Sequence, residues 1–120
     1  MTRVPSSLIT GIGGQDGSYL AELLLVQGHE VWGIVRRPGA EYEHLAPLDG
    51  SIAIVAADLL DQASVAAAIR TSGAREIYNL ASPSFVPRSW DEPVRTATHA
   101  AVGVTSLLEA VRGVDPAIRV

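Results

Sequence analysis

The 120-residue sequence contains no cysteine and no lysine. Without cysteine the chain can form neither a disulfide nor a thiolate site, so we expect a cytoplasmic location. All nine basic residues are arginines. This excludes from these residues a Walker-type phosphate loop, a Schiff-base lysine and any tyrosine–lysine catalytic couple.

Long apolar runs and blocks of one charge are missing as well. No apolar stretch approaches the roughly 18 residues that cross a bilayer, and the first residues, Met1–Pro5, lack the apolar segment of a signal peptide. The net charge is −4 and there is no basic run. We therefore expect neither a membrane nor nucleic acid as a partner, and the length favours a single domain.

The most informative stretch runs from Leu8 to Leu20 and predicts a strand, a glycine turn and a helix. Gly11, Gly14 and Gly17 stand three apart, which lets the backbone turn sharply, approach a ligand and pack a helix against a sheet. The helix predicted over Ser18–Gln27 directs its amino-terminal N–H groups into this turn, which suits a pyrophosphate. The spacing GxxGxxG differs from the GxGxxG dinucleotide fingerprint. Whether this turn binds a dinucleotide therefore has to be judged from the rest of the chain.

Short apolar segments alternate with helical patterns along the chain, as in parallel sheets whose strands are joined by helices. We expect a Rossmann-like α/β fold with a parallel sheet in the order 3-2-1-4 and a fifth strand only begun beside the fourth. The expected strands are 8–10, 30–35, 51–56, 76–80 and the start of a fifth from 118. The expected helices after the first are a short turn at 41–45, then 62–71 with Asp61 as its N-cap, and 94–112.

Four loops follow strands at the carboxyl edge of this sheet, where ligands bind in such folds. After the second strand an NAD-binding unit places an acidic residue, but this chain has Arg36 and Arg37. Two guanidinium groups suit the 2′-phosphate of NADP, and a solvated basic turn is the alternative. After the third strand, Asp58 and Leu59 flank an adenine, unless Asp58 caps the next helix. Leu80–Ser84 pass under the ribose and phosphates or form an ordinary loop.

Two further observations concern side chains that could bind ions. The histidines have no metal-ligand spacing, so no metal site is expected, and all three are expected at the surface: His29, His44 and His99. Asp16 stands beside the expected pyrophosphate. Because like charges repel, we expect it to organise the turn rather than contact phosphate.

The sequence resembles the extended short-chain dehydrogenases that act on nucleotide sugars, and among them the GDP-mannose 4,6-dehydratases. The resemblance covers nearly the whole chain. Its GQDGSYLAE run, followed by a double arginine, is far more specific than a glycine triplet. The matching segments are Leu8–Ile12, Gly14–Glu22, Gly33–Arg37, Asp58–Leu59, Glu76–Ala81 and Leu107–Arg112.

The resemblance implies an NADP cofactor that takes a hydride from C4 of the sugar, so that water is lost across C5 and C6, and returns it to C6. It implies a sugar nucleotide of the GDP-mannose kind as substrate of the complete enzyme. Ser84 is also a candidate to face that substrate. The cofactor-binding residues it implies are Gly11, Ile12, Gly13, Gly14, Gln15 and Asp16 at the pyrophosphate, Arg36 and Arg37 at the 2′-phosphate, Asp58 and Leu59 at the adenine, and Leu80, Ala81 and Ser84 near the ribose and nicotinamide.

Departures from the family pattern leave a related epimerase or reductase open as alternatives. Gly13 replaces the usual threonine, and the loop after Arg37 is several residues shorter. Ser82–Pro83 stands where Ala-Gln is expected, and Arg95 falls where a cofactor-contacting tyrosine is usual.

In this family the catalytic Ser or Thr, the glutamate, the Tyr-x-x-x-Lys couple and the sugar-nucleotide domain follow the fifth strand. We therefore expect residues 1–120 to be the amino-terminal, NADP-binding part of a longer enzyme, without a substrate domain and inactive alone. The fourth strand would then be an edge through which the chain pairs into a homo-oligomer. A non-catalytic nucleotide-binding module is the alternative from another class.

Overall fold

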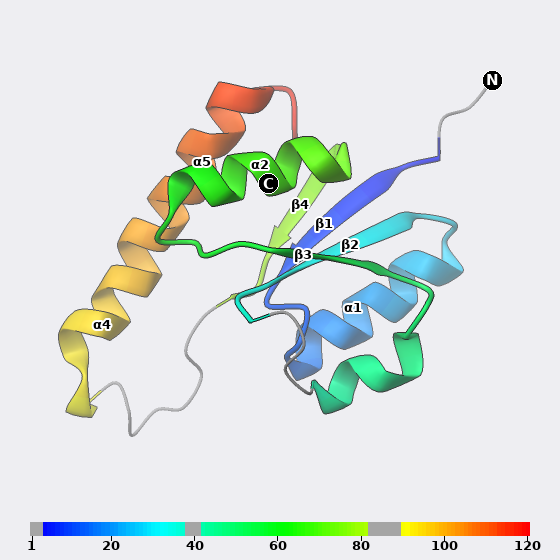
Figure 1. Ribbon diagram of the computed structural model, residues 1–120, viewed down its shortest axis with the longest axis horizontal. Coiled ribbons are helices and arrows are strands. Elements are labelled where there is room, and N and C mark those ends of the chain that lie inside the picture. Colours follow the sequence, from blue (N-terminus) through cyan, green and yellow to red (C-terminus); the bar gives the residue numbers. More distant parts are fainter. Residues whose placement is uncertain (1–3, 38–41, 82–89) are drawn as a thin grey trace.

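A four-stranded parallel sheet in the order β3-β2-β1-β4 forms the centre of the structure (Figure 1). The computed structural model describes residues 4–37, 42–81 and 90–120. The observed order confirms the predicted Rossmann-like arrangement. The strands are β1 (Ser6–Thr10), β2 (Glu30–Val35), β3 (Ala53–Ala56) and β4 (Glu76–Asn79).

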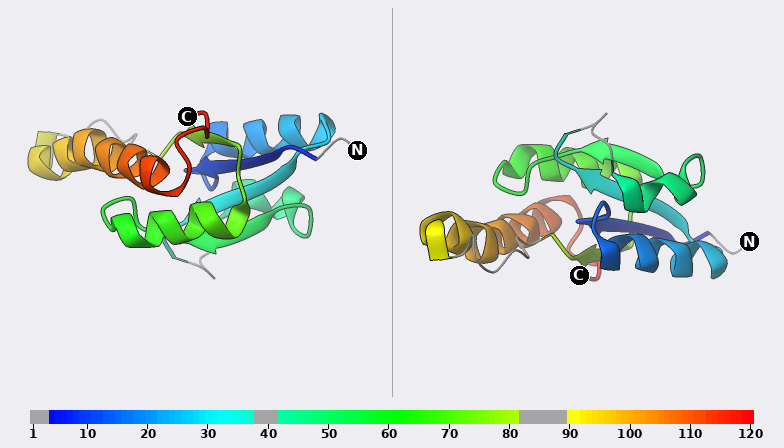
Figure 2. Two further views of the ribbon diagram at one scale, coloured as in Figure 1. Left: turned by 90° about the horizontal axis from the view of Figure 1, so that it is seen from above. Right: turned by 90° about the horizontal axis from the view of Figure 1, so that it is seen from below.

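Helices lie on both faces of the sheet, with α1 and α2 on opposite sides (Figure 2). One face carries α1 (Gln15–Val26) and the short 3-10 helix η1 (Glu43–Leu48). The other carries α2 (Gln62–Ser72) and α5 (Gly103–Val114), which pack on each other. A π-helical turn, η2 (Thr98–Val102), joins α5 to the preceding α4 (Pro93–Ala97), so residues 93–114 form one long helical rod.

The alternation of side chains along β1 separates two apolar layers. Leu8 and Ile9 are both fully buried, yet they point to opposite faces. Leu8 packs with residues of α2 and α5, whereas Ile9 packs with residues of α1. Only the middle of this strand is apolar, and its polar residues Ser6, Ser7 and Thr10 are buried with their hydroxyls in hydrogen bonds.

The element boundaries differ from the predicted ones where glycine and proline stand. The first helix begins at Gln15 rather than Ser18, because Gly14 takes the N-cap position in extended backbone. The predicted turn at 41–45 is a 3-10 helix that includes Pro47. Asp61 caps α2 as predicted, since its carboxylate accepts from the Ser64 N–H at 3.4 Å.

The last residues pair with β4 in parallel, as predicted for the start of a fifth strand. Arg119 forms a bridge with Glu76. The Ile77 N–H donates to the Arg119 carbonyl at 2.8 Å, and the Arg119 N–H donates to the Arg75 carbonyl at 3.1 Å. Part of the outer side of β4 is therefore already covered within this chain.

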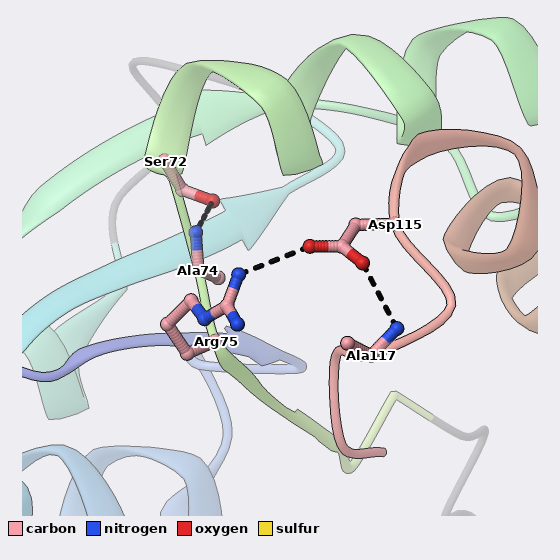
Figure 3. A network of polar contacts seen from close by, with 5 residues as sticks. All are labelled: Ser72, Ala74, Arg75, Asp115 and Ala117. Atoms are coloured by element: carbon pink, nitrogen blue, oxygen red, sulfur yellow. Dashed lines mark hydrogen bonds and ion pairs between the residues drawn. The ribbon is translucent and has the colours of Figure 1, made fainter.

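A polar network fixes the entrance to β4 (Figure 3). The Arg75 guanidinium donates to the Asp115 carboxylate at 3.0 Å, and the other oxygen of Asp115 accepts from the Ala117 N–H at 2.9 Å. The Ser72 hydroxyl, at the end of α2, accepts from the Ala74 N–H at 3.2 Å. These bonds join the ends of α2 and α5 to the amino-terminal end of β4. They lie at the opposite end of the strand from its carboxyl end.

The carboxylate of Glu76 yields a prediction about pH. It accepts from the Tyr78 hydroxyl at 2.9 Å and from Arg119 at 2.7 Å. The hydrogen bond to Glu76, then burial and the negative charge, raise the pKa of Tyr78 above its ordinary value of 10.0 despite the opposing charge of Arg119. Because the neutral phenol is favoured in the fold, its contribution to stability is complete below the unfolded pKa and is lost as pH rises through the folded one.

We therefore expect an ultraviolet titration of the tyrosinates to show Tyr78 ionising above the ordinary tyrosine pKa, with Tyr78→Phe identifying its signal. Glu76→Gln should shift that signal to lower pH, because the amide carries no charge. An unchanged signal in Glu76→Gln would contradict this assignment.

Candidate functional site

A cleft of about 400 Å³ opens at the carboxyl ends of the strands, the edge at which parallel α/β sheets bind ligands. The turn after β1, the end of β2, the loop after β3 and the amino-terminal half of the long helical rod form its walls. The lining residues are Thr10, Gly11, Gly13, Gly14, Ile34, Val35, Arg36, Tyr42, Ala57, Asp58, Leu59, Ala81, Glu92, Arg95, Thr96 and His99.

The turn after β1 approaches the end of β4 so closely that its first residue has to be glycine. Gly11 has a positive φ of 72°, and a Cβ built on it would lie 2.8 Å from the Ala81 nitrogen and from the Leu80 carbonyl carbon. Both features disfavour any other residue. Helix α1 begins directly after Gly13 and Gly14, so the positive end of its dipole lies at the cleft.

The buried hydroxyl of Thr10 joins β1 to its neighbour β4 at this edge. It donates to the Asn79 side-chain oxygen at 2.6 Å and accepts from the Leu80 and Ala81 N–H groups, each at 3.1 Å. A threonine hydroxyl has one donor and two acceptor positions, and all three are used here. The chain leaving β4 is therefore held against the glycine turn.

Only one residue of the double arginine lines the cleft. Arg36 and Arg37 are both exposed, but Arg36 lies on the cleft wall and Arg37 does not. Asp58 lines the same cleft as Arg36. Its carboxylate accepts from the Leu60 N–H at 2.9 Å. The alternative role of Asp58 as a helix cap is wrong, because Asp61 occupies that position.

The cleft gathers most of the residues expected at a cofactor. Ile12 is fully buried and packs in the core on the α1 face. Ser84 falls outside the described residues. Those that line the cleft are Gly11, Gly13, Gly14, Arg36, Asp58, Leu59 and Ala81, and those that do not are Ile12, Gln15, Asp16, Arg37 and Leu80.

The helical rod adds polar residues that the sequence analysis did not assign to the site. Glu92, Thr96 and His99 recur at a helical spacing that places them on one side, a signal that could have been noticed. The Arg95 guanidinium lies 3.7 Å from the Glu92 carboxylate. Nδ1 of His99 lies 2.9 Å from the Arg95 carbonyl, which only accepts, so Nδ1 carries the proton.

The histidines differ from one another in burial. His44 is exposed, whereas His99 is half-buried in the cleft wall and His29 is half-buried at 2.8 Å from the Ser7 hydroxyl. Across residues 4–37, 42–81 and 90–120, no three histidine, aspartate or glutamate side chains gather as a metal ion would require. None of the helices within those ranges combines the length and apolar character of a membrane span.

The sheet order, the glycine turn closing on β4 and the helix start at the cleft define a Rossmann-like fold of the short-chain dehydrogenase type. The family model described as GDP-mannose 4,6 dehydratase matches residues 8–120, and the chain belongs to this family.

Individual relatives agree with this assignment. The human GDP-mannose 4,6 dehydratase is 44% identical over 115 residues, which are 88% of this chain and 31% of that protein. The Drosophila melanogaster GDP-mannose 4,6 dehydratase is 42% identical over 120 residues, 92% of this chain and 30% of that protein. Among solved structures, UDP-glucose 4-epimerase from Thermus thermophilus, a complex with NAD, has a TM-score of 0.79 and 28% identity over 90% of this chain and 34% of that one. The chain thus spans about a third of the length of these relatives.

The bonds of Thr10 provide a test of how the cleft is held together. Thr10→Val keeps the side-chain shape but leaves the Ala81 N–H and the Asn79 side-chain oxygen without their partner, and leaves the Leu80 N–H with only the Thr10 carbonyl at 3.2 Å. We expect a loss of about 2–3 kcal/mol in the free energy of unfolding, measured by urea denaturation. Thr10→Ser, which keeps the hydroxyl, should lose much less; a loss in Thr10→Ser as large as that in Thr10→Val would contradict a leading role for the hydroxyl.

Proposed function

We propose that residues 1–120 form the amino-terminal, NADP-binding domain of a nucleotide-sugar 4,6-dehydratase whose substrate is a sugar nucleotide of the GDP-mannose kind. The observation that carries the proposal is the combination, in one cleft, of a glycine turn at a helix start and a guanidinium at the end of β2. Membership of the GDP-mannose 4,6 dehydratase family supports the choice of reaction.

The residues of the cleft fit the parts of a dinucleotide. Gly13, Gly14 and the first N–H groups of α1 suit the pyrophosphate, because backbone can approach it there without a side chain between. Asp58 and Leu59 offer a carboxylate and an apolar surface to the adenine. Bound NADP supplies the hydride chemistry of the reaction, while the chain's own residues bind and orient it.

The end of β2 favours a 2′-phosphorylated cofactor. A ribose 2′-hydroxyl is held best by a carboxylate that accepts its hydrogen bond, and β2 is followed by two arginines instead. Arg36 can only donate, and its fork pairs with two phosphate oxygens. We therefore propose NADP for this chain, although the Thermus thermophilus epimerase was crystallised with NAD.

The acid–base chemistry of the reaction is proposed to come from outside these 120 residues. The Tyr-x-x-x-Lys couple implied by the resemblance needs a lysine, and the sequence contains none. The lining of the described cleft includes Asp58, Glu92, His99 and Tyr42, none of which belongs to a Tyr-x-x-x-Lys couple. On this proposal the present chain holds the cofactor, and a following segment completes the site for the sugar.

Arg36 is the residue whose removal should distinguish the two cofactors. In Arg36→Ala we expect NADPH affinity to fall about ten- to a hundredfold, since charge-assisted bonds to the 2′-phosphate contribute about 1.5–3 kcal/mol. NADH has no such phosphate, so its affinity should change little. Isothermal titration of the purified chain with each nucleotide measures both values.

Arg70→Ala is the matched control, because Arg70 is an exposed arginine on α2 that does not line the cleft. It removes the same charge and should leave NADPH affinity unchanged. Arg37→Ala shows whether the neighbouring arginine shares the role. Tighter binding of NADH than NADPH by the unaltered chain would contradict the NADP assignment.

A further inference from the structure

The ring of Tyr42 occupies the direction in which a side chain of Gly13 would point. A Cβ built on Gly13 would lie 2.5 Å from Cδ1, 3.0 Å from Cε1 and 3.2 Å from Cγ of that ring. Gly13 is not among the glycines with positive φ. Its φ therefore does not call for glycine, and the three atoms nearest to the built Cβ all belong to the tyrosine ring.

Tyr42 is held in place from several directions. It is half-buried against the apolar cluster on the α1 face, and its carbonyl accepts from the Leu45 N–H at 3.0 Å in the first turn of η1. Its hydroxyl donates to the Arg37 carbonyl at 3.3 Å. The ring thus connects the glycine turn after β1 to the turn after β2, two segments that no strand pairing joins at this point.

We propose that Tyr42, seated on Gly13, is a positioning residue that sets the preference for a 2′-phosphorylated nucleotide. This inference rests on the proposed function. The ring and Arg36 line the same cleft, and the hydroxyl bonds to the residue next to Arg36. By holding the turn after β2 against the glycine turn, the ring fixes the distance between the guanidinium and the pyrophosphate position.

Loss of the Tyr42 contact is expected to affect NADPH and NADH binding differently, because the pyrophosphate and the adenosine ribose of the nucleotide lie against different walls of the cleft. The glycine turn and the start of α1 face groups that NADPH and NADH share. The turn after β2 faces the 2′-phosphate, which only NADPH carries. Loosening the contact between the turns should therefore weaken NADPH binding more than NADH binding.

A double-mutant cycle on Gly13 and Tyr42 tests the contact and its role together. In Gly13→Ala the new methyl group displaces the ring, and in Tyr42→Ala the ring is gone. We expect each single variant to lower NADPH affinity about tenfold, and Tyr42→Ala to change NADH affinity by less than about threefold. In the double variant the methyl group meets no ring, so the second substitution should add less than about a twofold loss.

Two controls separate this role from a general loss of structure. Tyr42→Phe keeps the ring on Gly13 but removes its bond to the Arg37 carbonyl, so it should lower NADPH affinity, by less than Tyr42→Ala does, and leave NADH affinity unchanged. Gly113→Ala repeats the glycine substitution on α5, where a Cβ would meet nothing within 4 Å, and should change neither affinity. Thermal unfolding of every variant identifies any that fails to fold.

Independent, additive losses at the two positions would overturn the proposed contact. An NADPH-to-NADH ratio that Tyr42→Ala leaves unchanged would overturn the role of Tyr42 in specificity while leaving the proposed function intact. Failure of the unaltered, folded chain to bind either nucleotide would overturn the proposed function and this inference with it. The thermal-unfolding cycle would then still report whether Gly13 and Tyr42 are coupled.

Discussion

The hydroxyl of Thr10 stands at the point where the neighbouring strands β1 and β4 end side by side, and the geometry of the cleft depends on its three hydrogen bonds. Thr10 is paired in register with Asn79. By also accepting from the Leu80 and Ala81 N–H groups, it brings the backbone after β4 against the turn that begins at Gly11. The segment after β4 therefore forms a wall of the cleft, because the buried Thr10 hydroxyl accepts hydrogen bonds from its backbone beyond the last strand pair.

Charge in this protein matters by position and not by sum. The chain as a whole carries a net charge of −4, whereas among the described cleft residues Arg36 and Arg95 are matched by Asp58 and Glu92, and a helix start lies beside them. Arg36 comes from the end of β2, and Arg95 comes from the helical rod beside Glu92. Because Coulomb interactions fall off within about 10 Å at ordinary salt, these local groups govern what the cleft attracts.

Patterns that act within a few residues predicted much of this structure. The strand order followed from alternating strands and helices together with the right-handed crossover rule, and Asp61 was identified as a cap from its place before an alanine-rich helix. The sequence did not predict three site residues, because they reach the cleft only through the packing of the long helical rod on the sheet; these are Glu92, Thr96 and His99. Their helical spacing indicated a shared side but not which surface that side meets.

The order of the elements and the glycine turn after β1 could be predicted from residue patterns, because both depend on local backbone preferences and on the handedness of parallel crossovers. Which of the two arginines lines the cleft, and the place of the Tyr42 ring where a side chain of Gly13 would point, depend on the packing of the folded chain. The physical reason is that such contacts join segments far apart in the chain. Their geometry is set by how the layers pack, which no local pattern encodes.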